Sequence, residues 1–199
     1  TKYDLDEVAS SLYIEYSISG SGEIIVDYQL NTDPQNEKRK MPLRVGMQMQ
    51  LPSQFNNLEY YGRGPHENYK DRKNSALIKK YSQTVAEQYY PYIRPQETGN
   101  KSDVRWLMLE GNNINLKVEG EQPFNFTALH YLMKDLDDGE KRDQRHAAEV
   151  KPLELTSLFI DKAQMGLGSI TSWGHLPLEK YRLLDEKYHY RFKITPETK

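Results

Sequence analysis

The sequence predicts an all-β protein, folded as an antiparallel β-sandwich of about eight to ten short strands. Apolar and polar residues alternate in segment after segment, and turn-forming residues interrupt the pattern roughly every ten residues. The chain has 15 tyrosines against five phenylalanines, and aromatic side chains with a polar end suit half-buried sheet faces. No repeat, low-complexity tract or linker divides the 199 residues. We therefore expect a single domain over residues 1–199.

The predicted strands are short segments in which apolar and polar side chains alternate. They are residues 12–18, 24–30, 43–51, 58–61, 104–109, 114–118, 124–128, 153–160 and 188–194. Gly20-Ser21-Gly22 separates the first two segments, and Gly111-Asn112-Asn113 follows the segment that ends at residue 109. Both are turn sequences, so each flanking pair is predicted to form a β-hairpin. Between Leu155 and Leu158 the alternation slips, which favours a β-bulge at that point.

The segments between the predicted strands are expected to be loops, with little helix. Residues 31–40 and 135–145 are polar and charged, which is typical of exposed loops. Residues 84–90 are able to form about one or two helical turns. Thr127 is a candidate cap for a short helix ending at Lys134, because a threonine hydroxyl can accept a hydrogen bond from the first turn.

Residues 60–72, YYGRGPHENYKDR, are the densest group of residues with special backbone or hydrogen-bonding roles. Gly62 and Gly64 can adopt a positive φ or let another chain segment come close, and Pro65 keeps Gly64 out of the α region. The residues that follow can satisfy loop backbone groups or pair with one another. These residues are Glu67, Asn68, Tyr69, Asp71 and Arg72. We predict an ordered, partly buried loop here.

Composition excludes several classes of function. A net charge of −2 gives no electrostatic footprint for nucleic acid or an anionic membrane. No apolar run approaches the roughly 18 residues of a membrane-spanning helix. The amino terminus has no basic segment followed by an apolar stretch, so we expect no signal peptide in it. Without cysteine, disulfides and thiolate sites are excluded, and both cytoplasm and periplasm stay open as compartments.

No metal or phosphate motif is present, and the role of the acidic residues is open. The five histidines lack the close spacing of a zinc site, and there is no calcium loop, phosphate loop or nucleophile elbow. The acids near structured loops are Glu67, Asp71, Glu97 and Asp103. Retaining glycosidases need two carboxyl groups roughly 5 Å apart, a geometry that a sequence does not display. Acids near turns more often bind backbone groups or arginine.

Trp173 lies in a glycine-rich loop, GLGSITSWGH, over residues 166–175. A tryptophan beside glycines either anchors its loop or offers the flat face of its indole to a ligand. Such a face suits the C–H side of a sugar ring. The chemistry of the residues leaves both roles open.

Several separated motifs resemble the C-terminal domain of large family 2 β-galactosidases. Residues 60–72 resemble its Gly-x-Gly-Pro-x-Glu-Asn-Tyr-x-Asp-Arg signature, and residues 92–99 resemble its Tyr-Val-x-Pro-x-Glu-x-Gly loop. Met165-Gly166-Leu167-Gly168 with Ser172-Trp173 resembles its closing segment. The chain departs from the family at the polar stretch 135–145 and at Ile170-Thr171, where the family has two aspartates. The resemblance is specific because the motifs recur in one order.

The resemblance implies a sandwich related to the galactose mutarotase-like fold. The family domain is longer, so its first portion would lie before Thr1 and the chain would be truncated at its N-terminus. The catalytic glutamates of the family and its magnesium and sodium sites lie in other domains, and no catalytic residue, metal or cofactor is expected in this chain. Trp173 matches a tryptophan that the domain lends to the aglycone side of the active site. The residues expected to form a structural motif are Gly62, Gly64, Pro65, Glu67, Asn68, Tyr69, Asp71 and Arg72.

The resemblance thus implies an accessory domain of a retaining β-galactosidase that hydrolyses terminal β-D-galactosides. The domain would pack on the catalytic barrel and would be inactive alone. Its expected partners are the remaining domains of the parent enzyme and the galactoside substrate, with no nucleic acid or membrane. Two alternatives stay open. One is a free-standing mutarotase-like aldose epimerase with a histidine and a carboxylate as acid and base, and the other is a non-catalytic carbohydrate-binding module.

Overall fold

A computed structural model describes residues 1–137, 146–171 and 174–199 of the chain. Within these residues the regular secondary structure is almost entirely strand, as the sequence predicts. The strands are β1 (Lys2–Leu5), β2 (Ser10–Ile18), β3 (Ile24–Thr32), β4 (Arg44–Pro52), β5 (Asn57–Gly64), β6 (Leu77–Thr84), β7 (Lys101–Glu110), β8 (Ile114–Leu129), β9 (Leu155–Gln164) and β10 (Lys187–Thr198). The helical elements are η1 (Asp6–Val8), η2 (Ala86–Gln88), α1 (Met133–Leu136) and η4 (Glu179–Tyr181). Among the described residues, no helix is long and apolar enough to cross a membrane.

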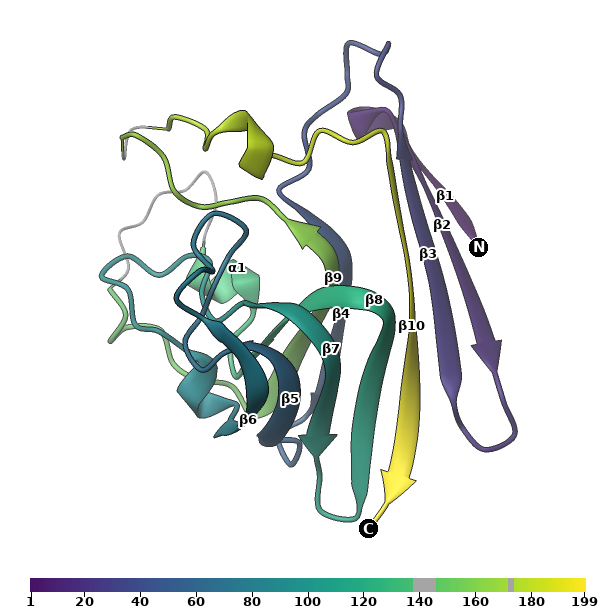
Figure 1. The fold of residues 1–199 in the computed structure, drawn as a ribbon, viewed down its shortest axis with the longest axis vertical. Coiled ribbons are helices and arrows are strands. Elements are labelled where there is room, and N and C mark those ends of the chain that lie inside the picture. The colour runs from purple at the N-terminus through teal and green to yellow at the C-terminus, as the bar shows by residue number, and fades with distance from the viewer. Residues whose placement is uncertain (138–145, 172–173) are drawn as a thin grey trace.

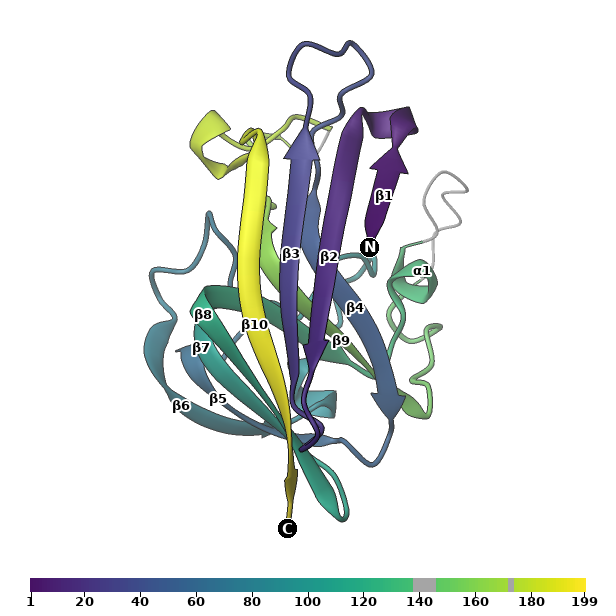
Figure 2. The ribbon, with the colours of Figure 1, turned by 90° about the vertical axis from the view of Figure 1, so that its right-hand side faces the viewer.

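The described strands form one antiparallel sheet that folds back on itself into two layers. The strand order is β1-β2-β3-β10-β8-β7-β5-β6, and β4 joins through β9, which pairs with β8. Figure 2 shows β1, β2, β3 and β10 in front of β4 and β9, and Figure 1 shows the same two layers from the side. The all-β sandwich predicted from the sequence is therefore confirmed.

The long strand β8 connects the two layers. Its first part, through Gly120, pairs with β10, and its last part, from Asn125 to Leu129, pairs with β9. The ladder to β7 is interrupted at the same point, since it passes from Glu119 to Phe124. Pro123 has no N–H to donate to a ladder, and a Cβ at Gly120 would lie 2.8 Å from the ring of Phe124. The strand bends here, and its pairing partner changes from β10 to β9.

The core lies between the layers and is built from the alternating side chains that the sequence shows. On β10, Tyr188, Tyr190, Phe192 and Ile194 are buried, while the residues between them are more exposed. The hydroxyl of Tyr190 donates a hydrogen bond of 2.9 Å to the carbonyl of Ile160 in the opposite layer. Burying one such aromatic or aliphatic side chain stabilises the fold by about 1.5–3 kcal/mol.

Several local predictions are wrong. Thr127 does not cap a helix, because β8 continues through it to Leu129 and pairs with β9, and α1 begins only at Met133. Residues 114–118 and 124–128 are one strand, not two. The expected bulge near Leu155 is absent from the pairing of β9, whose register shift lies instead at Lys162. The alternation slips because Thr156 and Ser157 are buried polar residues.

Two strands were not predicted at all. Strand β1 is short and fully exposed, so its sequence has no apolar face to indicate a strand. Strand β6 occupies residues 77–84, where charged and apolar residues do not alternate cleanly. The helical turn expected over residues 84–90 is only the three-residue η2. The predicted loop over residues 135–145 lies mostly outside the described residues.

Candidate functional site

The signature segment 60–72 starts as a strand and continues as a loop. Its two glycines lie in β5, and neither has a positive φ. Each instead admits a close neighbour, the second of the two roles expected from the sequence. A Cβ at Gly62 would lie 2.6 Å from the side chain of Val104, and one at Gly64 would clash with the hydroxyl of Tyr60. The cis bond between Gly64 and Pro65 then leads into the loop.

Asn68 joins this loop to the start of β7. Its side-chain amide donates to the carbonyls of Arg63 and His66, both at 3.1 Å. Its side-chain oxygen accepts from the backbone N–H of Ser102 at 3.0 Å and from the Ser102 hydroxyl at 2.5 Å. Asn68 is fully buried, so each of these bonds replaces one to water, and the loss of any of them leaves a buried polar group unpaired.

Glu67 is the acceptor for a second set of donors. It receives the backbone N–H of Gly99 at 2.7 Å, the Thr98 hydroxyl at 3.2 Å and the Arg72 guanidinium at 2.5 Å, together with the hydroxyl of Tyr92. Burial alone raises the pKa of Glu67, but these hydrogen bonds and the charge of Arg72 outweigh it and hold the pKa below its ordinary value of 4.5. Glu67 therefore stays ionised and holds the loop 92–99 against the signature loop.

A more deeply buried ion cluster lies beside it and was not predicted. Arg44 of β4 binds Glu97 at 2.8 Å and lies 3.3 Å from Asp161 of β9. Tyr69, only 1% exposed, donates toward Glu97 at 3.3 Å. Burial raises the pKa of Glu97, and it raises the pKa of Asp161 to about 7 in spite of Arg44. The sequence signal for this cluster is an aspartate within an apolar strand.

Asp71 links the signature loop to the loop that contains Trp173 in the sequence. Its carboxylate oxygen Oδ2 accepts a hydrogen bond of 2.5 Å from the backbone N–H of Gly168. A Cβ at Gly166 would lie 2.8 Å from the Asp71 carboxyl carbon, and one at Gly168 would lie 2.7 Å from Oδ2. Glycine at both positions thus lets the backbone lie directly against the carboxylate.

The Trp173 residue itself, with Ser172, lies outside the described residues. Its predicted contact with a sugar is therefore not tested by the structure. The described parts of its loop are residues 166–171 and 174–178, which lead into η4.

Two hollows flank Gly168. One, of about 520 Å³, is lined by Asp71, Gly168, Ser169, Ile170, His175, Leu176, Pro177, Leu178, Glu179, Tyr181 and Arg182. The other, of about 650 Å³, is lined by Arg72, Tyr92, Ile93, Arg94, Gln96, Glu97, Leu167 and Gly168. Around them the side chains of Ile93 and Ile170 are each 83% exposed, and Leu178 is 60% exposed. The end of the molecule formed by these loops therefore combines two hollows of mixed lining with uncovered apolar side chains.

The acidic residues near structured loops have partners within this chain. Glu67, Asp71 and Glu97 are bonded as described above. Asp103 has a positive φ of 53° and binds Arg63 at 2.5 Å and Lys73 at 2.9 Å. Such contacts fit the structural role of these acids better than a catalytic pair. Among the described residues, no group of three or more histidine, aspartate or glutamate side chains is placed to hold a metal ion.

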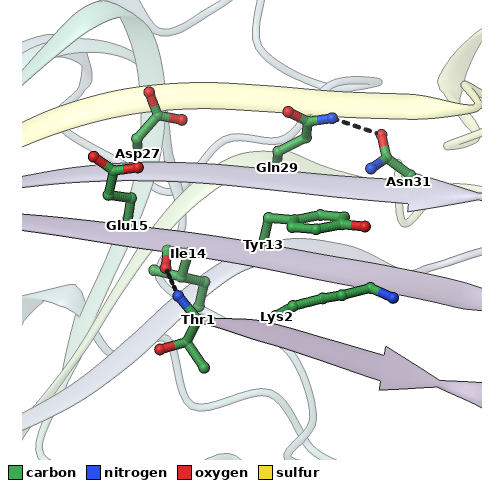
Figure 3. A pocket seen from close by; sticks show the side chains of 8 residues that line it. All are labelled: Thr1, Lys2, Tyr13, Ile14, Glu15, Asp27, Gln29 and Asn31. Carbon is green, nitrogen blue, oxygen red and sulfur yellow. Dashed lines mark hydrogen bonds between the residues drawn. The ribbon is translucent and has the colours of Figure 1, made fainter.

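A third hollow, of about 630 Å³, lies on the outer face of β1, β2 and β3 (Figure 3). Polar side chains and the ring of Tyr13 line it, and Gln29 donates to Asn31 at 2.9 Å. The ammonium group of Lys2 lies 5.8 Å from the centre of the Tyr13 ring. A sugar stacking on that face of the ring has to displace this cation.

Comparison with known proteins gives a consistent result. A family model described as "Beta galactosidase small chain" matches residues 1–194. The chain is 31% identical over 194 residues to a β-galactosidase of Priestia megaterium, with 96% of this chain and 18% of that protein covered. It is 33% identical over 195 residues to a β-galactosidase of Lactococcus lactis, with 95% and 18% covered. A Vibrio cholerae β-galactosidase is 34% identical over 151 residues, with 76% and 14% covered. The chain thus spans less than a fifth of the length of these relatives.

Proposed function

Because the chain belongs to the β-galactosidase small-chain family, we propose that it is the accessory β-sandwich of a larger retaining β-galactosidase. In this proposal the nucleophile and the acid that cleave the terminal β-D-galactoside come from another domain of the parent protein. The observation that carries the proposal is the match over residues 1–194 to relatives of which the chain covers 18% or less. The internal pairing of the acids in the described loops supports it.

The partner is the rest of the parent polypeptide, and the loop end around Gly168 is the surface proposed to meet it. Ile93, Ile170 and Leu178 are exposed there, beside two hollows that both include Gly168. Exposed apolar side chains gathered around such hollows are typical of a surface that another domain covers.

Trp173 is proposed to offer its indole to the sugar or its aglycone. The residue follows Gly168 by five positions in the sequence, and the described residues Ile170 and His175 on either side of it line one of the hollows. Magnesium and sodium, if the parent uses them as its family resemblance implies, would be held by other domains.

The test is turnover of a chromogenic β-galactoside by the purified chain and by the complete parent protein. We expect no turnover by the chain alone, because it lacks the reacting carboxylates, and turnover by the parent. Hydrolysis by the pure chain at a rate near that of the parent would overturn the proposal. Any trace activity is checked by mass spectrometry for contaminating enzyme.

A second candidate function is carbohydrate binding without catalysis, which the Tyr13 hollow of Figure 3 favours. Titration of galactosides into the unchanged chain and into its Tyr13→Ala variant, with the two binding curves compared, tests it. An epimerase is less well supported. The described ion pair His189–Asp27, at 2.9 Å, lies on the outer face of the sheet, and about half of each side chain is exposed to solvent. Polarimetry of anomer interconversion tests that alternative.

A further inference from the structure

Two carboxylates share one arginine beneath the loop 92–99. Arg44 of β4 binds Glu97 of this loop at 2.8 Å and lies 3.3 Å from Asp161 of β9. The Arg44 guanidinium also lies over the ring of Phe159, 4.3 Å from its centre. Arg44 is therefore held by the strands β4 and β9, whereas Glu97 lies on a segment without regular structure.

Asp161 is the carboxylate of this cluster that lacks hydrogen-bond donors. It is fully buried, and neither of its carboxylate oxygens has a hydrogen-bond partner among the described residues. A Cβ at Gly46 would clash with its Oδ1, so the backbone of β4 lies directly against the carboxylate. A carboxylate without donors is costly to keep ionised in a protein interior. Burial accordingly raises the pKa of Asp161 to about 7 in spite of Arg44, and the charge of Glu97 raises it further.

Among the described residues, the other titratable groups that face the two acids do not supply a second positive charge. They are Tyr28 of β3, Tyr190 of β10, and Tyr69 and Glu67 of the signature loop. Burial raises the pKa of all three tyrosines, which therefore stay neutral. The charge of Glu67 repels Glu97 and is itself paired with Arg72. Two buried acids thus face one guanidinium, an arrangement that is most stable when one of them carries a proton.

The loop 92–99 is the part of this arrangement that can move while the strands stay in place. Glu67 binds both ends of the loop, and the bond from Glu97 to Arg44 fixes the stretch between them. That stretch includes Ile93, which is 83% exposed, and together with Glu97 it lines the hollow of about 650 Å³. Loosening of the bond between Glu97 and Arg44 therefore changes the wall of this hollow.

We propose that Arg44, Glu97 and Asp161 form a proton-controlled latch, which holds the loop 92–99 when one of the two acids is protonated and loosens it when both are ionised. With a proton on Asp161, Glu97 alone binds the guanidinium. Once that proton is lost, the two anions repel each other and compete for Arg44. Opening of the loop separates them, so the closed loop binds more protons than the open loop and opens more often as pH rises. The latch is a property of this chain and does not rest on the proposed function.

Hydrogen exchange of the backbone amides of Thr98 and Gly99, followed by NMR in the full chain, measures the opening of the loop. Both residues are buried, and Gly99 donates its N–H to Glu67, which stays ionised in this pH range. After correction for the intrinsic exchange rate, we expect their protection to fall about three- to tenfold from pH 6 to pH 8.5. The opening exposes little surface, so low concentrations of urea should not change it. The amide of Phe192 in β10 is the reference for global unfolding, and its exchange should accelerate with urea.

Two variants each remove one of the acids. Asp161→Asn has the shape of the protonated acid, and we expect high protection of the loop at both pH values. Glu97→Gln removes the charge that holds the loop, and we expect protection at pH 6 to fall to the level that the unchanged chain shows at pH 8.5, with no further pH dependence. Asp103→Asn is the matched control, because Asp103 also pairs with two cations, Arg63 and Lys73, outside the cluster. It is expected to keep the full pH dependence.

Three results would overturn the latch. The first is loop amides whose protection does not fall with pH, or whose protection and urea dependence equal those of Phe192, since the loop would then open only when the whole chain unfolds. The second is a pH dependence that persists in Asp161→Asn. The third is a midpoint that shifts when sodium is replaced by potassium at constant ionic strength, because a bound cation and not a proton would then balance the two acids.

Discussion

Two carboxylates, the partly buried Glu67 and the fully buried Asp161, show how different the same group becomes in different surroundings. Glu67, in the signature loop, accepts from a backbone N–H, three hydroxyls and a guanidinium, and its pKa lies below the ordinary value. Asp161, in β9, is completely buried, with Arg44 at 3.3 Å and no hydrogen-bond partner for either oxygen among the described residues, and its pKa rises to about 7. Asp161 is more deeply buried than Glu67 and has no hydrogen-bond donor among the described residues, whereas the donors around Glu67 outweigh its partial burial, so the two pKa values shift in opposite directions.

The comparison teaches which of the two regions stabilises the ionised state. Around Glu67 the protein replaces the water that a carboxylate loses, and the charge joins the signature loop to the loop 92–99. Around Asp161 it does not, because Glu97 competes for the same arginine. A second negative charge in the cluster raises the pKa of Asp161 further. We therefore expect opposite responses when each carboxylate is removed or protonated.

The largest effect is expected from Glu67→Ala, which should lower the free energy of unfolding by about 3–5 kcal/mol. The substitution removes an ionised acceptor from the buried N–H of Gly99 and from the hydroxyls around it, and each hydrogen bond to a charged group contributes about 1.5–3 kcal/mol. The side chain of Arg72 is 46% exposed, so water can replace its partner there. Urea denaturation measures it. Glu87→Ala is the matched control, since Glu87 also accepts a backbone N–H, from Thr84 at 2.6 Å, but at the surface. Equal losses for the two variants would contradict the account.

A comparable or smaller effect, of up to about 4 kcal/mol, is expected from the titration of Asp161. Its folded pKa of about 7 exceeds the ordinary 3.8, so the folded state binds more protons between these values. The free energy of unfolding should fall as pH rises through this window and level off above it. Asp161→Asn should remove most of this slope and make the protein more stable at pH 8.

The dependence of the free energy of unfolding on pH also includes a contribution from Glu67, with a sign opposite to that of Asp161. Because the folded pKa of Glu67 is lowered, its contribution to stability is present above pH 4.5 and is lost as pH falls through the folded pKa. Denaturation midpoints from pH 3 to 8 measure both carboxylates. A slope between pH 4 and 7 that Asp161→Asn leaves unchanged would refute the assignment to Asp161.

The smallest effect is expected from Tyr92→Phe, which removes one of the donors to Glu67. One hydrogen bond to a charged group contributes about 1.5 kcal/mol, and Tyr92 is partly exposed, so water can replace part of it. We expect a loss of about 1 kcal/mol and a rise in the pKa of Glu67. Carbon-detected NMR titration of the Glu67 carboxyl measures the pKa, and a fall in it would show that Tyr92 is not a net donor.

The sequence predicts the strands well where one face of the sheet is buried. Residues 188–194 alternate because β10 has the core on one side and solvent on the other. The prediction of strands from alternation fails where the strand does not have one buried face and one exposed face. Strand β1 is exposed throughout, and β9 buries Thr156 and Ser157, whose polarity imitates a bulge. Pro123 indicates a strand end, but β8 only bends there and continues.

In the candidate site, too, the sequence identifies some residues, and only the structure reveals the others. The resemblance identifies Glu67, Asn68 and Asp71 because their motif is contiguous, and the structure adds what they bind. The partners of these residues, among them Gly99, Ser102 and Gly168, lie far away in the chain. Arg44 and Asp161 belong to no local motif, since they meet only when β4 pairs with β9. No spacing in the sequence reports such a contact.

The most direct test of the accessory role is reconstitution of the parent β-galactosidase from two pieces. The parent without the residues of this chain, this chain alone, and the two mixed are compared for turnover of a chromogenic β-galactoside. We expect little turnover by either piece and a gain on mixing that saturates with the concentration of the chain. Full turnover by the truncated parent, with no change when the chain is added, would contradict the account.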